Sequence, residues 1–175
     1  MHTPSQLLQD LSAGRHDPAL AALYALDGTA ESLDRARERA EHVVQCFIDA
    51  FSPAPETSAA LFSGPGRTEI GGNHTDHQHG HVLCGSVDLD MLACAAPNGQ
   101  NVIRVVSEGY PVLKVELDKL IPRKEERNTS AALVRGVAAK IQELGYPLAG
   151  FDAYVTSSVL SGSGLSSSAA YEILM

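Results

Sequence analysis

The feature that most constrains the fold lies near the end of the chain, where a strand pattern passes through a Gly/Ser-rich loop into a helix pattern. Phe151–Ser157 is rich in apolar and β-branched residues, as strands are. Gly162–Ser168 is loop-like, and apolar residues follow at helical spacing until the sequence stops at Met175. The fold must contain both strands and helices. Because a helix of about two turns depends on packing, we also expect the chain to be truncated here.

The central part of the sequence predicts further strands. β-branched and apolar residues dominate Val87–Ala96 and Asn101–Ser107, and Pro97–Gln100 between them is a hairpin-turn signal. Val112–Leu117 alternates polar and apolar residues and predicts a third strand. Together these runs predict a mainly antiparallel sheet.

Helical patterns precede and follow these strands. One helix is expected to start at Asp17-Pro18, a longer one to run from Thr29 toward Asp49, and a third to end at Gly145. The fold class is therefore α+β. We expect a helical N-terminal extension over residues 1–50 and a second region over residues 51–175, with Pro53 and Pro55 in the connection between them.

Composition excludes several classes of function. The 13 basic and 21 acidic residues give a net charge of −8, which disfavours nucleic acid as a partner. The start of the chain lacks a secretion signal, and the longest apolar run, Met91–Ala96, is far too short to cross a bilayer. We therefore expect a cytoplasmic protein without a membrane partner. Its three cysteines, Cys46, Cys84 and Cys94, are expected to be reduced and mostly buried.

Two constellations carry candidate chemistry. Gly66–His77, GRTEIGGNHTDH, combines a cation, an amide, an imidazole and a carboxylate, which suit a polyol because Asp accepts from hydroxyls and Asn both donates and accepts. Gly162–Ala170, GSGLSSSAA, combines glycines with serines at the start of a helix, as an anion-binding cradle requires. The second is not a Walker loop, because no Lys follows the glycines. It is also not the dinucleotide fingerprint, because Ser167 stands at the third glycine position.

The two constellations together resemble galactokinases, within the GHMP kinase superfamily. Arg67–His77 is similar to the family's GR(V/x)N(L/x)IGEHTDY signature, and Gly162–Ala170 to its GxGLSSSA nucleotide loop. The resemblance extends in order through VSEG at 106–109, VRGV at 134–137 and GFDA at 150–153. It implies the α+β N-terminal domain of GHMP kinases (ribosomal protein S5 domain 2-like), with the C-terminal domain of the same protein absent from this chain.

The resemblance also implies an activity and residue roles. ATP, with Mg2+, would phosphorylate galactose or a related sugar at its anomeric hydroxyl, and Arg67 would stabilise the transferring phosphoryl group. The sugar site would contain Asn73, His74, Thr75 and Asp76. The residues that would bind ATP are Gly162, Ser163, Gly164, Leu165, Ser166, Ser167 and Ser168, with Ser107 as a minor contact. Ser168 would also bind Mg2+, whereas the catalytic Asp base would lie beyond Met175, so the chain alone is expected to be inactive.

Three departures from the family pattern bear on function. Asn73 stands where the family has Glu, His77 where it has Tyr, and Ser130 near the place of an aromatic residue. The first change bears on the choice of sugar and the last on the grip on adenine.

Other interpretations stay open at this stage. The histidines at 74, 77, 79 and 81 are compatible with a structural metal, Arg67 with a surface ion pair to Glu69, and Asp76 with turn capping. The Gly/Ser loop alone is compatible with a flexible turn. The whole chain is compatible with a non-catalytic sensor that binds sugar and nucleotide, or with an α+β interaction domain that binds neither.

Overall fold

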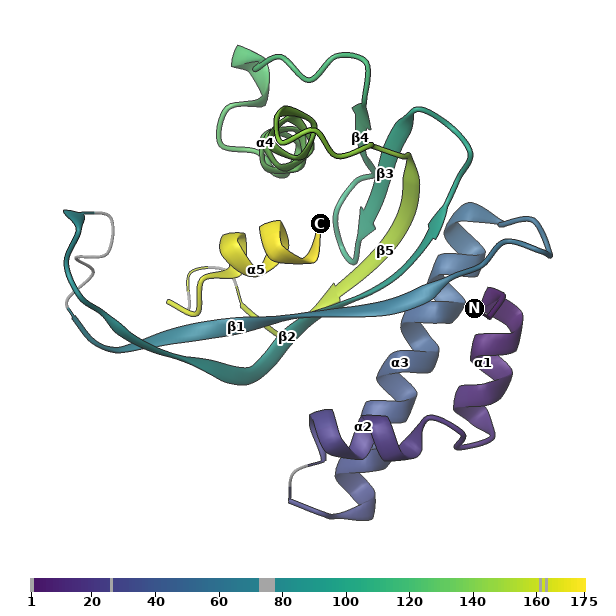
Figure 1. The fold of residues 1–175 in the computed structure, drawn as a ribbon. Coiled ribbons are helices and arrows are strands. Elements are labelled where there is room, and N and C mark those ends of the chain that lie inside the picture. The colour runs from purple at the N-terminus through teal and green to yellow at the C-terminus, as the bar shows by residue number, and fades with distance from the viewer. Residues whose placement is uncertain (1, 26, 73–77, 161, 163) are drawn as a thin grey trace. The chain divides into compact units, whose positions relative to one another are not determined.

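The structure is a computed structural model that describes residues 2–25, 27–72, 78–160, 162 and 164–175. Figure 1 shows how its helices and strands follow one another along the chain. Their bounds are α1 (Pro4–Ser12), α2 (Asp17–Tyr24), α3 (Ala30–Phe51), β1 (Ala60–Gly71), β2 (Leu83–Pro97), β3 (Val102–Ser107), β4 (Leu113–Glu116), η2 (Lys124–Glu126), α4 (Ser130–Glu143), β5 (Phe151–Ser157) and α5 (Ser167–Leu174). No helix of this described part is long and apolar enough to cross a membrane.

The strands form one five-stranded sheet in the order β1-β2-β5-β3-β4. β3 pairs antiparallel with β4, with Ile103 opposite Val115, and parallel with β5, with Val105 opposite Ala153. The predicted α+β class, with a mostly antiparallel sheet and preceding helices, is confirmed.

The predicted hairpin between β2 and β3 is wrong, because β5 lies between these two strands. The turn residues bind the start of β5 instead: the Asn98 backbone N–H donates to the Gly150 carbonyl at 3.2 Å, and the Asn98 amide donates to Asp152 at 2.8 Å. A Cβ atom at Gly150 would collide with the carbonyl oxygens of Gln100 and Val102. Residues 97–100 thus connect β2 to β3, but β5 lies between these strands in the sheet.

The chain divides into two compact units. The first contains Met1–Phe62 with Leu92–Thr156, and the second contains Ser63–Met91 with Ser157–Met175. The core of the first unit packs α1, α2 and α3 against one face of β2. Its members are Leu7, Leu11, Leu20, Ala36, Ala40, Val43, Val44, Phe47, Ala59, Leu92, Cys94 and Ala96.

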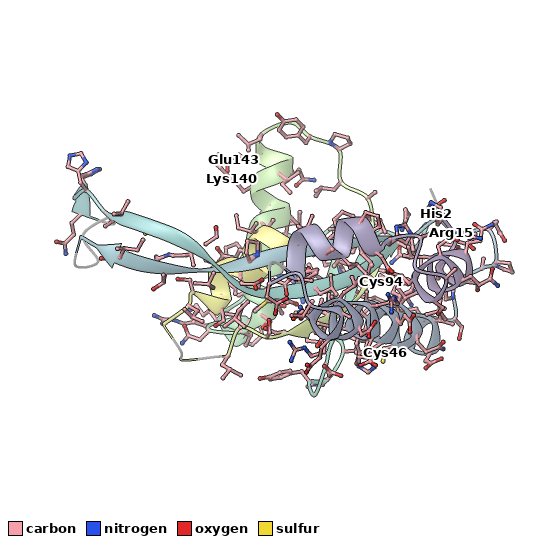
Figure 2. The ribbon with its side chains drawn as sticks, turned by 90° about the horizontal axis from the view of Figure 1, so that it is seen from below. His2, Arg15, Cys46, Cys94, Lys140 and Glu143 are labelled. Atoms are coloured by element: carbon pink, nitrogen blue, oxygen red, sulfur yellow. The ribbon has the colours of Figure 1, made fainter. Side chains whose placement is uncertain are left out.

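Within this core, α3 is defined by its cap and its apolar stripe. Thr29 caps the helix by accepting from the Ser32 N–H at 3.2 Å, and Ala40, Val43 and Phe47 are buried on one side. Cys94, labelled in Figure 2, is fully buried among them, and this burial raises the pKa of its thiol to about 12. All three cysteines are free, but Cys84 is exposed and Cys46 half-buried, so the expectation of mostly buried thiols is wrong.

α4 packs against β4 and lies on the face of β3, β4 and β5 opposite α3 (Figure 1). It begins after the cap Thr129. It ends before Gly145, which has φ +85°, and this end is where the sequence predicts it. Arg135 on its buried side forms a bidentate ion pair with Glu126 of η2, at 2.7 Å for each contact, and donates to the Lys119 carbonyl. The helix is thus fastened to the segment that precedes it.

Candidate functional site

Arg67 lies in the second unit, on β1, where its side chain is half-buried. Its Nη1 atom is buried, and no described residue accepts a hydrogen bond from it. Glu69 thus does not pair with Nη1, which has no partner among the described residues. A buried donor without an acceptor is costly, so this nitrogen suits a ligand that brings an acceptor.

The Gly/Ser loop has an unusual backbone. Gly162 and Gly164 both have φ +77°, and a Cβ atom at either position would meet nothing within 4 Å. Ser166, the N-cap of α5, also has a positive φ of 59° and makes no side-chain capping bond. Such a conformation is uncommon for a residue other than glycine and is often found at functional sites. Positive φ angles thus recur at Gly162, Gly164 and Ser166 in the described part of the loop.

The start of α5 lies directly after this bend. The first N–H groups of a helix have no partner within the helix, and the helix dipole places partial positive charge there. The Ser168 side chain is exposed and Ser166 and Ser167 are half-buried, so hydroxyls and amides share the same end of α5. These groups are of the kind that a phosphate cradle requires, and their role in phosphate binding stays a prediction; Ser163 lies outside the described residues.

Two contacts bring Arg67 and the loop together within the second unit. The Arg67 backbone N–H donates to the Leu165 carbonyl at 3.1 Å. At neighbouring Gly66, a Cβ atom would lie 3.1 Å from the same Leu165 oxygen and 3.2 Å from a methyl group of Val159. The strand that carries the cation is therefore packed directly against the end of the loop.

Gly64 extends this close packing to α5. A Cβ atom there would lie 2.9 Å from the Ala170 carbonyl oxygen and 3.2 Å from Leu174 Cβ, so any larger residue would displace the helix. The contact of Gly64 with α5 was not predicted from the sequence. The available signal was the spacing of two between Gly64 and Gly66, which places both residues on one face of a strand.

The remaining predicted residues lie either outside the described residues or in the first unit. Asn73, His74, Thr75 and Asp76 lie outside the described residues, as do His77 and Ser163. Ser107 ends β3 in the first unit, where its carbonyl accepts from the Tyr110 N–H at 2.9 Å. Its part in nucleotide binding stays a prediction.

Glu108, which follows Ser107, belongs to a polar cluster of the first unit. Its carboxylate accepts from the Thr156 hydroxyl at 2.7 Å and lies 2.8 Å from His42 Nε2, and both interactions hold the pKa of the carboxyl below the ordinary value. The described residues include no group of three or more His, Cys, Asp or Glu side chains that could hold a metal ion. For Mg2+, the donor at the Gly/Ser loop is a hydroxyl such as that of Ser168, which would complement phosphate oxygens.

Comparisons with known proteins are consistent with this geometry. Residues 45–97 match the galactokinase galactose-binding signature. The chain is 33% identical to a Streptococcus suis galactokinase over 139 residues, covering 77% of this chain and 34% of that protein. A Clostridium tetani galactokinase is 32% identical over 120 residues, covering 69% and 30%. The chain thus spans about a third of the length of the curated relatives that it matches.

Solved structures give the same result for the fold. The Lactococcus lactis galactokinase complexed with galactose matches with a TM-score of 0.66 and 28% identity, over 74% of this chain and 34% of that one. The Methanococcus jannaschii mevalonate kinase matches with a TM-score of 0.54 and 17% identity, over 69% and 39%, which shows a shared fold.

Proposed function

We propose that this chain, which is related to galactokinases over their N-terminal part, forms the sugar- and phosphate-binding portion of an ATP-dependent sugar 1-kinase. One observation carries the proposal: the strand of Arg67, whose buried Nη1 has no acceptor among the described residues, is hydrogen-bonded to the Gly/Ser loop through Leu165. A cation beside a backbone cradle is what phosphoryl transfer requires, since that reaction depends on positioning and charge neutralisation.

In this proposal each part of the site has one role. The loop from Gly162 to Ser168 binds the ATP phosphates through its amides, its hydroxyls and the positive end of α5. Arg67 stabilises the negative charge of the phosphoryl group during transfer. Bound Mg2+ would neutralise phosphate charge, and Ser168 would supply one of its oxygen ligands.

The sugar site is proposed at the signature that includes residues 73–76. Asn73, His74, Thr75 and Asp76 all lie within the region that matches the galactose-binding signature, and Asp76 would accept from a sugar hydroxyl. Galactose is the first candidate, and the reaction would proceed in the cytoplasm. Transfer itself would require an Asp base that the resemblance places outside this chain.

Binding of MgATP, measured by calorimetry, tests the proposal. Gly164→Val places a β-branched residue at a backbone with φ +77° and should change the conformation of the loop, so we expect affinity for MgATP to fall at least roughly tenfold. Gly28→Val is the matched control, because Gly28 has φ +68° and equally open surroundings but lies before α3 in the first unit. Equal affinity in the wild type and Gly164→Val, or no binding by the wild type, would contradict the proposal.

A further inference from the structure

The chain is fastened to β2 at the point where it leaves β5 and approaches the Gly/Ser loop. Three hydrogen bonds join Ser158 to the backbone of Asp90: the Ser158 N–H donates to the Asp90 carbonyl at 2.9 Å, the Ser158 hydroxyl donates to that carbonyl at 3.0 Å, and the Asp90 N–H donates to the hydroxyl at 2.9 Å. One side chain thus satisfies both backbone groups of Asp90, as a paired strand would.

The side chain of Asp90 extends the same connection to β1. It is 4% exposed, and one of its carboxylate oxygens accepts from the Ser63 hydroxyl at 2.5 Å. Ser63 belongs to the strand that carries Arg67 four residues later. The start of the loop and the strand of the proposed catalytic cation are therefore linked through a single buried residue.

The neighbours of Ser158 are fixed as well. The Ser157 hydroxyl accepts from the Val159 N–H at 3.1 Å and donates to the Val159 carbonyl at 3.0 Å. Val159 is 3% exposed, whereas Leu160 is 71% exposed. The buried part of this segment thus ends at Val159.

Both ends of the loop are consequently attached to the β1–β2 ribbon within the second unit. The front end is held by Ser158 and Asp90, and the rear end by the hydrogen bond from Arg67 to Leu165. Between these attachments the backbone takes the positive φ angles at Gly162 and Gly164. A loop of this length held only at its rear would sample many conformations, and ordering it would reduce the affinity for a ligand.

We infer that Ser158 is a positioning residue for phosphate binding, which fixes the front end of the Gly/Ser loop at a set distance from Arg67, and that Asp90 transmits this position to β1. The inference rests on the proposed function, since it assigns a residue that serves the same phosphate site. Ser158 itself need not touch the nucleotide. Its hydroxyl acts through the position of the chain that follows it toward the loop.

Two measurements on the chain test the inference: amide hydrogen exchange without ligand, and the affinity for MgATP. Ser158→Ala should accelerate exchange within residues 160–166 and weaken MgATP binding on the order of tenfold, as loss of one or two hydrogen bonds would. Ser158→Thr keeps the hydroxyl and should restore both. Ser32→Ala is the control, because it removes a buried serine with several hydrogen bonds from the start of α3 in the first unit.

The outcomes separate this inference from the proposed function. Unchanged exchange in residues 160–166 of Ser158→Ala, or faster exchange with unchanged affinity for MgATP, would overturn the positioning role while leaving the phosphate site intact. Absence of MgATP binding by the wild type would overturn both. If Ser158→Ala does not fold, Ser63→Ala decides, because it removes only the link to Asp90: faster exchange in residues 160–166 supports the inference and unchanged exchange overturns it.

Discussion

Arg67 is the residue on which the proposed chemistry depends most directly. In the complete kinase, Arg67→Ala should lower kcat by roughly a hundredfold or more and change sugar affinity little, because the cation is needed chiefly as negative charge develops on the phosphoryl group. Steady-state kinetics with varied sugar and ATP measure this. Arg67→Lys keeps the charge without the planar guanidinium and should retain part of the activity. A kcat unchanged in Arg67→Ala would return Arg67 to a structural role.

Asn73 is the residue that should bear most on the choice of sugar. It stands at the signature position of a family Glu that would read the hydroxyl at C6. A carboxylate only accepts, whereas an amide also donates, and charged hydrogen bonds are worth about 1.5–3 kcal/mol against about 0.5–1.5 for neutral ones. Asn73→Glu should therefore shift the preference among sugars by roughly tenfold.

A substrate panel with the complete enzyme measures the effect of Asn73. Galactose, its 6-deoxy analogue, N-acetylgalactosamine and arabinose would be compared in the wild type and in Asn73→Glu. If the ranking of the four sugars is the same in both proteins, Asn73 does not read C6.

At the scale of residues, features that depend on neighbours in the sequence could be predicted. The bend of the Gly/Ser loop follows from two glycines and a serine close together, and the structure shows positive φ at all three. Ser158 and Asp90 carry no such pattern, because their bonds join residues 68 positions apart. The burial of the Arg67 Nη1 atom could not be predicted from the sequence either, since burial depends on packing around the strand.

Among the elements, η2 and α4 are joined by the ion pair between Glu126 and Arg135. The Arg135 side chain is 3% exposed, and its hydrogen bonds hold the pKa of the Glu126 carboxyl below its ordinary value of 4.5. A carboxyl whose folded pKa is depressed stabilises the fold above the unfolded pKa, and that stabilisation is lost as pH falls through the folded value. Glu126→Gln should therefore lower stability at pH 7 and flatten its decline below about pH 4.5, measured by urea unfolding at several pH values.

The exposed ion pair of the same helix provides the control. Lys140 and Glu143 are labelled in Figure 2. Lys140 Nζ lies 2.9 Å from Glu143 Oε1, and the two side chains are 60% and 68% exposed. Such pairs contribute little, so Glu143→Gln should leave the unfolding curves nearly unchanged. Equal acid sensitivity in the wild type and Glu126→Gln would show that the Arg135–Glu126 pair does not link folding to pH.

Element positions were more predictable than element pairing. β5 was predicted at 151–157 and is found there, and the ends of α4 follow its Thr cap and Gly145. The neighbours of each strand were not predictable from adjacent residues. Turn residues such as Asn98 favour a hairpin locally. In the structure Asn98 donates hydrogen bonds to Gly150 and Asp152, and β5 lies between β2 and β3.

At the scale of the whole molecule, the two units divide the predicted functions. Arg67 and the described part of the Gly/Ser loop lie in the second unit, whereas Ser107 and the helices α1–α3 lie in the first. The helices share a core with β2, which ties the N-terminal extension to the sheet. The predicted boundary at residue 50 stays a prediction.

Binding of MgATP and transfer of its phosphoryl group should be separable in this chain. The chain spans about a third of the length of the galactokinases that it matches, and the resemblance places the catalytic Asp base in the remaining part. We therefore expect the isolated chain to bind MgATP without transferring phosphate to galactose, because a positioned phosphoryl group still needs a base to take the proton of the attacking hydroxyl. A coupled assay for ADP release with galactose, alongside calorimetry with MgATP, measures both properties. Transfer at about 1–100 per second, the ordinary range for kinases, would place the base within these 175 residues and refute the assignment.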